Sequence, residues 1–218
     1  LISVPTNQPL IFIGEDGTGR RLATQFAHDI HATADSELIA VSGEDLPELS
    51  VDSLDKTIQH LTEGKSHCSL YLYNAENLSL EQWQSLFNHP KLERVFGAAT
   101  HVEKDIKNIA TLIHLPTLDE RKEDIGPLYK HFVRHAASRY QLQPPHISLD
   151  EVKYITELSW PENIKQLRRF AELRALKPDT FRIEDWNSDK SIEIQSMTQR
   201  TEHFEYCLLI DALQRHRG

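Results

Sequence analysis

Residues 10–20 read LIFIGEDGTGR, a short apolar run followed by a turn that contains three glycines. The apolar run predicts a buried strand, and the spacing of Leu22, Phe26 and Ile30 predicts a helix directly after the turn. A glycine-rich turn between a strand and a helix can wrap backbone N–H groups around phosphates, as in the pattern G-x-x-x-x-G-K-[ST]. The segment therefore predicts a phosphate-binding turn, and a tight turn without a ligand is the alternative.

The turn keeps the glycines of this pattern but changes its charged and hydroxyl positions. Arg20 stands where the pattern has lysine, and Arg21 stands where it has the hydroxyl that binds magnesium. Their guanidinium groups supply charge-assisted donors for phosphate, and a cyclic dinucleotide is one candidate ligand besides a nucleotide. The predicted ligand-binding residues of the turn are Gly14, Glu15, Asp16, Gly17, Thr18, Gly19, Arg20 and Arg21.

Length and composition limit the class of protein. A chain of 218 residues can bury a sizeable core, and we expect two unequal domains. The net charge of -9 argues against nucleic-acid binding by the chain as a whole. Cys68 and Cys207 lack metal-ligand spacing and fit a reducing cytosol. No run approaches the about 18 apolar residues of a membrane span, and no signal-peptide layout begins the chain, so we expect a cytoplasmic protein without a membrane partner.

Apolar runs alternate with helical spacing over the first half of the chain. This alternation predicts an α/β fold with a parallel sheet covered by helices on both faces. Ligands of such sheets bind at the carboxyl ends of the strands, where the glycine-rich turn would lie. We expect strands at 10–13, 38–41, 68–73, 94–99 and 112–115, and helices at 22–30, 54–61 and 80–87.

The strand patterns stop after residue 120, and three helices are expected at 125–140, 149–158 and 161–176. Ser148 or Asp150 is the expected cap of the second helix, and Pro161 suits the first turn of the third. Residues 165–177 read as part of a helix with a solvated basic face. The second half of the chain therefore predicts a small all-α subdomain.

The order of these segments resembles the AAA+ central domain of bacterial enhancer-binding proteins, the NtrC-type activators that act on sigma-54 RNA polymerase. IFIGEDGTGRRLATQFAH, residues 11–28, resembles the family's strand and its GESGTGKE turn. LPTLDERKEDIGPLYKHFV, residues 115–133, is similar to the family's LPPLRERREDI segment and the helix after it. LSWPENIKQLRR, residues 158–169, resembles the lid motif WPGNVREL. In this family glutamate commonly follows the lysine of the turn, so Arg21 departs less from the family than from the general pattern.

The resemblance implies a domain organisation and a set of partners. It implies ATP or ADP as the ligand with magnesium only on the nucleotide, self-association as a dimer or higher oligomer, DNA binding through a domain missing from this chain, and contact with RNA polymerase. Regulators of this kind often carry a receiver domain, for which the residues before the first strand are too few. The implied parts are a P-loop core over residues 1–118, a helical lid over 119–177, a linker over 178–197, and the start of a truncated Fis-type DNA-binding domain over 198–218.

Several departures from the family affect catalysis. The family's third strand ends in LFLDE, whose acidic pair holds magnesium and polarises water, but here Tyr73 and Asn74 occupy those positions. Neither is an anionic metal ligand or a general base at neutral pH. Glu76 lies nearby as a displaced base, and His101 ends the strand that closes with Ala-Thr-Asn in the family. Lys165 stands at the lid arginine and completes the predicted ligand-binding set.

Two further family segments are missing. Residues 101–114 are short and hold Lys104 and Lys107 where the family has two arginines that reach the neighbouring subunit's nucleotide. Residues 45–65 lack the polymerase-contacting GAFTGA loop. We therefore predict a degenerate domain that acts as a scaffold for oligomerisation or ligand sensing, binds nucleotide weakly or not at all, and has no catalytic residues. The alternatives are an active ATPase that uses Glu76, His101 and Lys165, and a nucleotide-independent partner-binding module.

Three other patterns have a structural interpretation. His131 and His135 stand four apart on one predicted helix face, as zinc ligands do, but the sequence offers no third ligand and a solvated face is favoured. Tyr71, Trp83 and Phe87 read as core or half-buried aromatic residues. The last predicted helix carries the apolar positions Phe204, Leu208, Leu209, Ala212 and Leu213, which suit either a dimer seam or packing on the core.

Overall fold

A computed structural model describes residues 8–31, 36–44, 46 and 50–177 of the chain. Five parallel strands form one sheet in the order β2-β3-β4-β1-β5. The predicted linker and last helix lie outside the described residues. The elements are β1 (Leu10–Ile13), α1 (Arg20–His31), β2 (Glu37–Ser42), α2 (Val51–Leu61), β3 (Cys68–Tyr73), α3 (Leu80–Phe87), β4 (Arg94–Ala99), the 3-10 helix η1 (Lys104–Asn108), β5 (Thr111–His114), α4 (Lys122–Arg139), α5 (Leu149–Glu157) and α6 (Asn163–Leu176).

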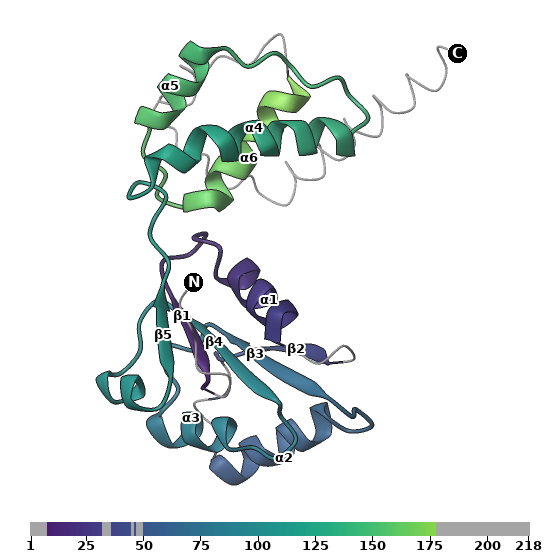
Figure 1. Cartoon of the computed structure of the whole chain (residues 1–218), viewed down its shortest axis with the longest axis vertical. Helices are drawn as coiled ribbons and strands as arrows, with labels where there is room; N and C mark the ends of the chain where they lie inside the picture. The colour runs from purple at the N-terminus through teal and green to yellow at the C-terminus, as the bar shows by residue number, and fades with distance from the viewer. Residues whose placement is uncertain (1–7, 32–35, 45, 47–49, 178–218) are drawn as a thin grey trace. The chain divides into compact units, whose positions relative to one another are not determined.

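Helices cover both faces of the sheet, as the alternating pattern predicts. Figure 1 shows α2 and α3 on one face and α1 on the other. The first face forms the larger apolar core, which includes the fully buried Trp83, and Tyr71 belongs to the smaller core on the α1 face. Phe87 is half-buried against the larger core. The α/β fold and the buried or half-buried state of these aromatic side chains are therefore confirmed.

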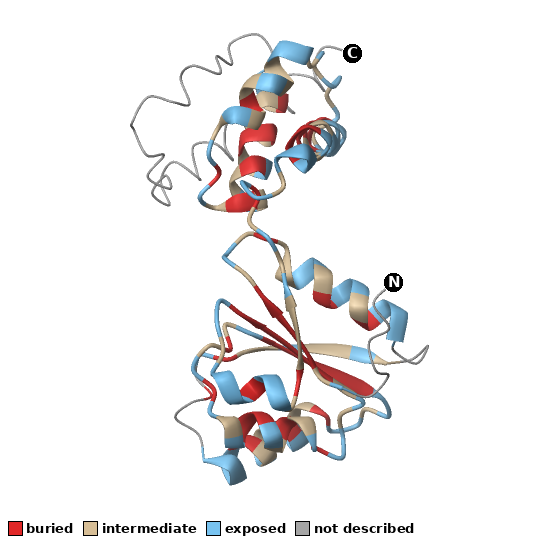
Figure 2. Cartoon of the chain, turned by 60° about the vertical axis from the view of Figure 1, so that its left-hand side comes forward, coloured by how far each residue is buried: buried red, intermediate tan, exposed pale blue. Residues whose placement is uncertain are grey.

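Helix α1 presents an unusual set of residues to the sheet. Its fully buried side chains are Thr24 and His28, while Leu22, Phe26 and Ile30 are exposed to 75%, 66% and 59%. Small side chains explain how α1 still packs, because Ala23 and Ala27 fill the contact with the smaller core. Figure 2 shows that the buried face of α1 is turned towards the strands and that its outer face is exposed. The apolar spacing identified this helix correctly, but the spaced residues point to solvent.

The three helices of the second half differ from expectation mainly at their starts. Helix α5 is capped by Ser148, whose side-chain oxygen accepts a hydrogen bond from the N–H of Glu151 at 3.0 Å. Helix α6 begins at Asn163 rather than at Pro161. The reason is the backbone of Asn163, whose φ of +52° is left-handed and interrupts helical geometry. Among the described helices, none is long and apolar enough to cross a membrane.

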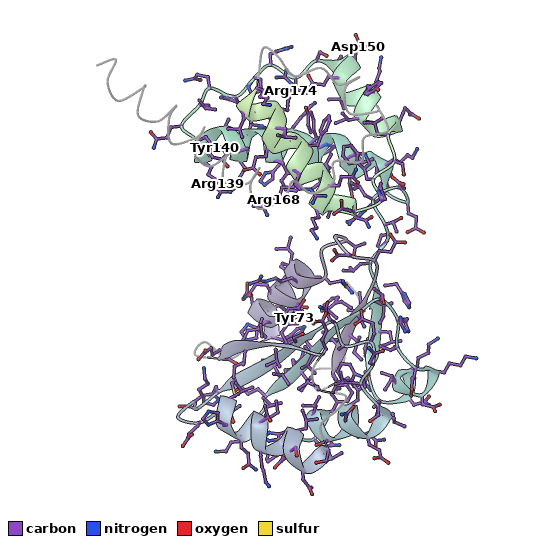
Figure 3. The ribbon with its side chains drawn as sticks, turned by 180° about the vertical axis from the view of Figure 1, so that it is seen from behind. Tyr73, Arg139, Tyr140, Asp150, Arg168 and Arg174 are labelled. Carbon is purple, nitrogen blue, oxygen red and sulfur yellow. The ribbon has the colours of Figure 1, made fainter. Side chains whose placement is uncertain are left out.

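Aromatic and ionic groups together form the core between α4, α5 and α6. The ring of Phe170 lies 5.7 Å from Tyr129 and 5.5 Å from Trp160, measured between centroids. Tyr129 donates a hydrogen bond to Glu151, and the Nε of Arg174 donates to the same carboxylate at 3.0 Å. The Arg174 and Glu151 side chains are only 12% and 9% exposed, so Arg174 does not belong to the solvated basic face that the sequence predicts (Figure 3).

Replacing Arg174 by leucine should destabilise the protein strongly. The substitution leaves the Glu151 carboxylate buried with one donor fewer, and breaking such a pair typically costs about 3 to 5 kcal/mol. The matched control is Lys153→Ala, because Lys153 and Asp150 form an exposed ion pair whose side chains are 79% and 95% exposed. The control should change the free energy of unfolding by less than about 0.5 kcal/mol. Urea denaturation measures both values, and equal losses would contradict the buried pair.

The same cluster predicts a loss of stability at high pH. Burial raises the pKa of Tyr129 above its ordinary value near 10, and the neighbouring Glu151 carboxylate raises it further. Above pH 10 the unfolded chain therefore loses the Tyr129 proton before the folded protein does, so the free energy of unfolding falls as pH rises. Tyr129→Phe lacks this ionisation and should show a smaller fall between pH 9 and 11. Denaturant unfolding across this range compares the two proteins.

Candidate functional site

The glycine-rich turn lies between the end of β1 and the start of α1. The Gly14 N–H donates to the Ala99 carbonyl of β4 at 3.1 Å, which fixes the turn beside the carboxyl ends of both strands. Gly17 and Gly19 have φ values of +79° and +106°, which side-chain-bearing residues rarely adopt. The hydroxyl of Thr18 donates to the Glu15 carbonyl at 2.8 Å and closes the turn. Six of the eight predicted residues, 14–19, therefore lie in one compact loop, and Arg20 and Arg21 begin the helix that follows it.

Arg20 is held between two carboxylates at the start of α1. Its guanidinium nitrogens lie 3.6 Å from Asp16 and 3.7 Å from Glu76, and its side chain is only 12% exposed. The first N–H groups of a helix have no partner within the helix, so the start of α1 can also attract an anion. The charge that would meet a phosphate here is already shared with two acidic groups.

Glu76 connects the turn to the end of β4. One of its carboxylate oxygens contacts Arg20 and also accepts a hydrogen bond from the Thr100 N–H at 2.8 Å. The Thr100 hydroxyl and the Nδ1 of His101 are hydrogen-bonded at 3.0 Å. The structure therefore brings Glu76 to the turn, as a displaced base would require, but commits that oxygen to contacts within the protein.

The two positions that end β3 and directly follow it, Tyr73 and Asn74, carry no acidic side chain. Tyr73 is 39% exposed, and its ring centroid lies 6.0 Å from that of Tyr71. Asn74 has a left-handed φ of +53°, and its Nδ2 donates to the Oε1 of Glu44 at 2.7 Å. The Asn74 side chain is thus paired with a residue that follows β2. Neither Tyr73 nor Asn74 provides the anionic oxygen that a magnesium ion prefers.

Arg20 and Arg21 also affect the smaller core behind the turn. Burial raises the pKa of Tyr71 above its ordinary value, and the positive charges of the two arginines partly oppose this shift. Arg21 itself is exposed on the surface of α1. Both arginines therefore place positive charge near the carboxyl ends of the strands.

Residues from the α6 segment contact the turn directly. The Nζ of Lys165 lies 3.2 Å from Asp16, and the Ile164 N–H donates to the Gly17 carbonyl at 3.0 Å. A β-carbon at Gly17 would overlap the carbonyl oxygen of Glu162, so this close approach requires glycine. The predicted ligand-binding residue Lys165 therefore does lie at the turn, but it is paired there with an acidic side chain.

Two residues of this site were missed from the sequence as ligand-site candidates. The buried Asn163 amide accepts a hydrogen bond from the Leu118 N–H at 2.7 Å and donates to the Asp16 carbonyl at 3.0 Å. Arg121 donates through a guanidinium nitrogen to the Thr18 carbonyl at 2.9 Å. Both residues lie in segments that resemble family motifs, LDER and WPEN, and this resemblance was the signal that could have pointed to them. The motifs alone do not predict that these side chains bind the turn.

The remaining candidate cations and histidines lie elsewhere. Lys104 and Lys107 are exposed on η1, and among the residues that the structure describes no hydrogen bond or ion pair joins either one to the turn. His131 and His135 are exposed on α4, with ring centroids 6.2 Å apart. As a whole the site can receive an anion at the turn and at the start of α1. The carboxylates of Asp16 and Glu76 are paired with Arg20 or Lys165, and the Glu15 carboxylate accepts a hydrogen bond from the Asn163 amide at 3.2 Å.

Comparison with known proteins finds a family model and several relatives that match parts of this chain. Residues 119–184 match the AAA+ ATPase lid domain. The chain is 28% identical to the phosphoglycerate transport system transcriptional regulatory protein PgtA of Salmonella typhimurium, over 95% of this chain and 52% of PgtA. It is 23% identical to the C4-dicarboxylate transport transcriptional regulatory protein DctD of Pseudomonas aeruginosa, over 94% of this chain and 53% of DctD. The chain thus spans about half the length of these relatives.

A solved structure shares the fold. The structure of NtrX from Brucella abortus in complex with ADP has a TM-score of 0.64 and 19% identity, and the match covers 92% of this chain and 57% of NtrX. Its likeness supports the architecture of a parallel sheet followed by a helical lid. The sheet, the lid match and the relatives together show that this chain is similar to the AAA+ domains of NtrC-family regulators.

Proposed function

We propose that this chain is a scaffold domain of a bacterial transcription regulator of the sigma-54 activator type, and that it binds nucleotide weakly without hydrolysing it. The observation that carries the proposal is the placement of Glu76 between Arg20 and the Thr100 N–H, at 3.7 Å and 2.8 Å. The carboxylate best placed to replace the missing catalytic acid is held by the residue that replaces the phosphate-binding lysine. The Arg20 guanidinium limits the use of Glu76 as a base, and the Glu76 carboxylate limits the use of Arg20 as a phosphate ligand.

The chemistry of phosphoryl transfer supports the absence of turnover. Hydrolysis needs a metal ion on the β- and γ-phosphates and a group that orients the attacking water. At the end of β3 the side chains are a phenol and an amide, and the amide of Asn74 is bonded to Glu44. A general base must reach its proton within hydrogen-bond distance, whereas the Glu76 oxygen that faces the turn is already occupied. His101 and Lys165, the other replacement candidates, are paired with Thr100 and Asp16.

Weak nucleotide binding follows from the same contacts. Phosphates would enter the turn formed by residues 14–21, with Lys165 beside it. A phosphate that binds Arg20 has to replace Asp16 and Glu76, and the negative charge of these side chains repels it. Nucleotide is the proposed ligand class because the similar NtrX structures were solved in complex with ADP and with ATP. Magnesium would enter only with the nucleotide.

The role of the whole protein is proposed from its relatives. PgtA and DctD are transcriptional regulatory proteins, so we place this domain in a regulator that acts on DNA in the cytoplasm. Residues 1–118 and 119–177 are the proposed core and lid, followed by a linker and the start of a Fis-type DNA-binding domain. Partners would be further copies of the chain, DNA through a domain missing from this chain, and RNA polymerase. Because residues 45–65 lack a GAFTGA loop, a scaffold role is favoured over a motor that remodels polymerase.

Glu76→Gln should tighten the binding of ATP. The glutamine oxygen can still accept the Thr100 hydrogen bond, while the loss of charge frees Arg20 for phosphate and removes one repulsion. We expect the dissociation constant to fall about 3- to 10-fold, the range of one charge-assisted contact. Isothermal titration measures this change. Glu44→Gln is the matched control, because Glu44 bonds to Asn74 and not to Arg20, and its affinity should stay within about twofold of the original.

Phosphate release decides between a scaffold and an ATPase. The original chain and both variants should release no phosphate from ATP above the buffer background. Steady hydrolysis by the original chain that disappears in Glu76→Gln, with nucleotide still bound, would contradict the proposal and establish Glu76 as a catalytic residue.

The melting temperature should show that ATP and ADP bind equally well. ATP and ADP at millimolar concentration should raise the melting temperature by similar small amounts, because any ligand that binds only the folded protein stabilises it. Arg20→Ala should abolish both shifts. A cyclic dinucleotide tested in parallel shows whether the turn prefers a different phosphate ligand. If no nucleotide changes the melting temperature, the chain is better described as a nucleotide-independent partner-binding module.

A further inference from the structure

The outer face of α1 carries an apolar stripe, defined as Leu22, Phe26 and Ile30. These side chains are exposed to 75%, 66% and 59%, and they make up half of the six large apolar residues that are exposed in the described part of the chain. The folded core does not use them, because α1 packs on the sheet through Ala23 and Ala27. We propose that the stripe is an isologous contact surface for α1 of a second copy of this chain.

The spacing of the stripe suits contact with an identical helix. Its residues are separated by four positions, so they form one of the ridges that run along an α-helix. Two such ridges interdigitate when the helices cross at about -50°, the commonest class of helix packing in globular proteins. Around a two-fold axis near Phe26, Leu22 of one copy approaches Ile30 of the other. The two ends of the stripe are therefore complementary in an antiparallel pair.

The next ridge of α1 supplies charge complementarity. Arg21, Gln25 and Asp29 are also four residues apart, and this charged row runs beside the apolar stripe. The Nε2 of Gln25 donates to the Oδ1 of Asp29 at 2.8 Å, which orders the middle of the row. The row begins with a positive charge and ends with a negative one. The same two-fold rotation also brings Arg21 of one copy towards Asp29 of the other, at both ends of the contact.

A second copy meets the requirements of this surface. An isologous interface must be complementary to itself, and both ridges of α1 have this property in size and in charge. A standard interface uses roughly 20 to 30 residues per partner, and three apolar side chains with their polar neighbours are far fewer. The contact is therefore a weak dimer contact that depends on protein concentration. It deepens the scaffold role proposed above and so rests on it for its biological meaning.

Charge exchange on α1 tests this contact. Sedimentation velocity from about 5 to about 500 µM should show a dimer of the original chain whose population rises with concentration. Asp29→Arg places two arginines opposite each other at both ends and should weaken the dimer at least tenfold. The double variant with Arg21→Asp and Asp29→Arg restores opposite charges across the axis and should recover dimerisation to within about threefold. Phe26→Ser should also shift the chain to monomer.

Leu149→Ser is the matched control, because Leu149 is 74% exposed but lies on α5. This variant should dimerise as the original chain does, and circular dichroism should show that every variant is folded. A chain that stays monomeric at 500 µM would overturn the proposal, as would a dimer that is unaffected by Asp29→Arg. The assay measures mass rather than nucleotide, so a failure here is distinct from a failure of the phosphate-site proposal.

Discussion

The parallel arrangement of the sheet is the constraint on which the site depends. Parallel strands all end at the same edge, so the residues that follow β1, β3 and β4 converge there although they are far apart in the sequence. Arg20, Glu76 and Thr100 meet at this edge within hydrogen-bond or ion-pair distance. Without this convergence Arg20 would lack its contact with Glu76. The same geometry explains why a change of residue type after one strand alters the chemistry of the next.

Arg20 illustrates how a binding turn can persist while its reactivity changes. A lysine and an arginine carry the same charge, but the planar guanidinium offers several donors and can contact more than one acceptor at once. Here it contacts the carboxylates of Asp16 and Glu76. The turn keeps its backbone conformation through Gly17 and Gly19, which depends on the glycines and not on the arginine. Shape and chemistry at this edge are therefore set by different residues.

The sequence predicted the elements well because their signals are local. The apolar run of β3 was expected at 68–73, where the structure has it, and Ser148 acts as a cap through a contact three residues away. The contacts of the site were not predictable in this way. Asn163 was read only as part of a helix start, but its amide reaches Asp16, 147 residues away in the chain. The sequence also did not predict that the α1 stripe faces solvent. Periodicity indicates a helix, but the contact with the sheet decides which side of that helix faces inward.

The Asn163 amide has a further consequence because one side chain serves three segments. Its oxygen holds the Leu118 N–H ahead of α4, its nitrogen holds the turn, and its own backbone opens α6. If an incoming anion reshaped the turn, the acceptors of this amide would shift together, and the strained left-handed residue that carries it would have to respond. Binding of an anion at the turn and the starting geometry of α4 and α6 would then be thermodynamically coupled.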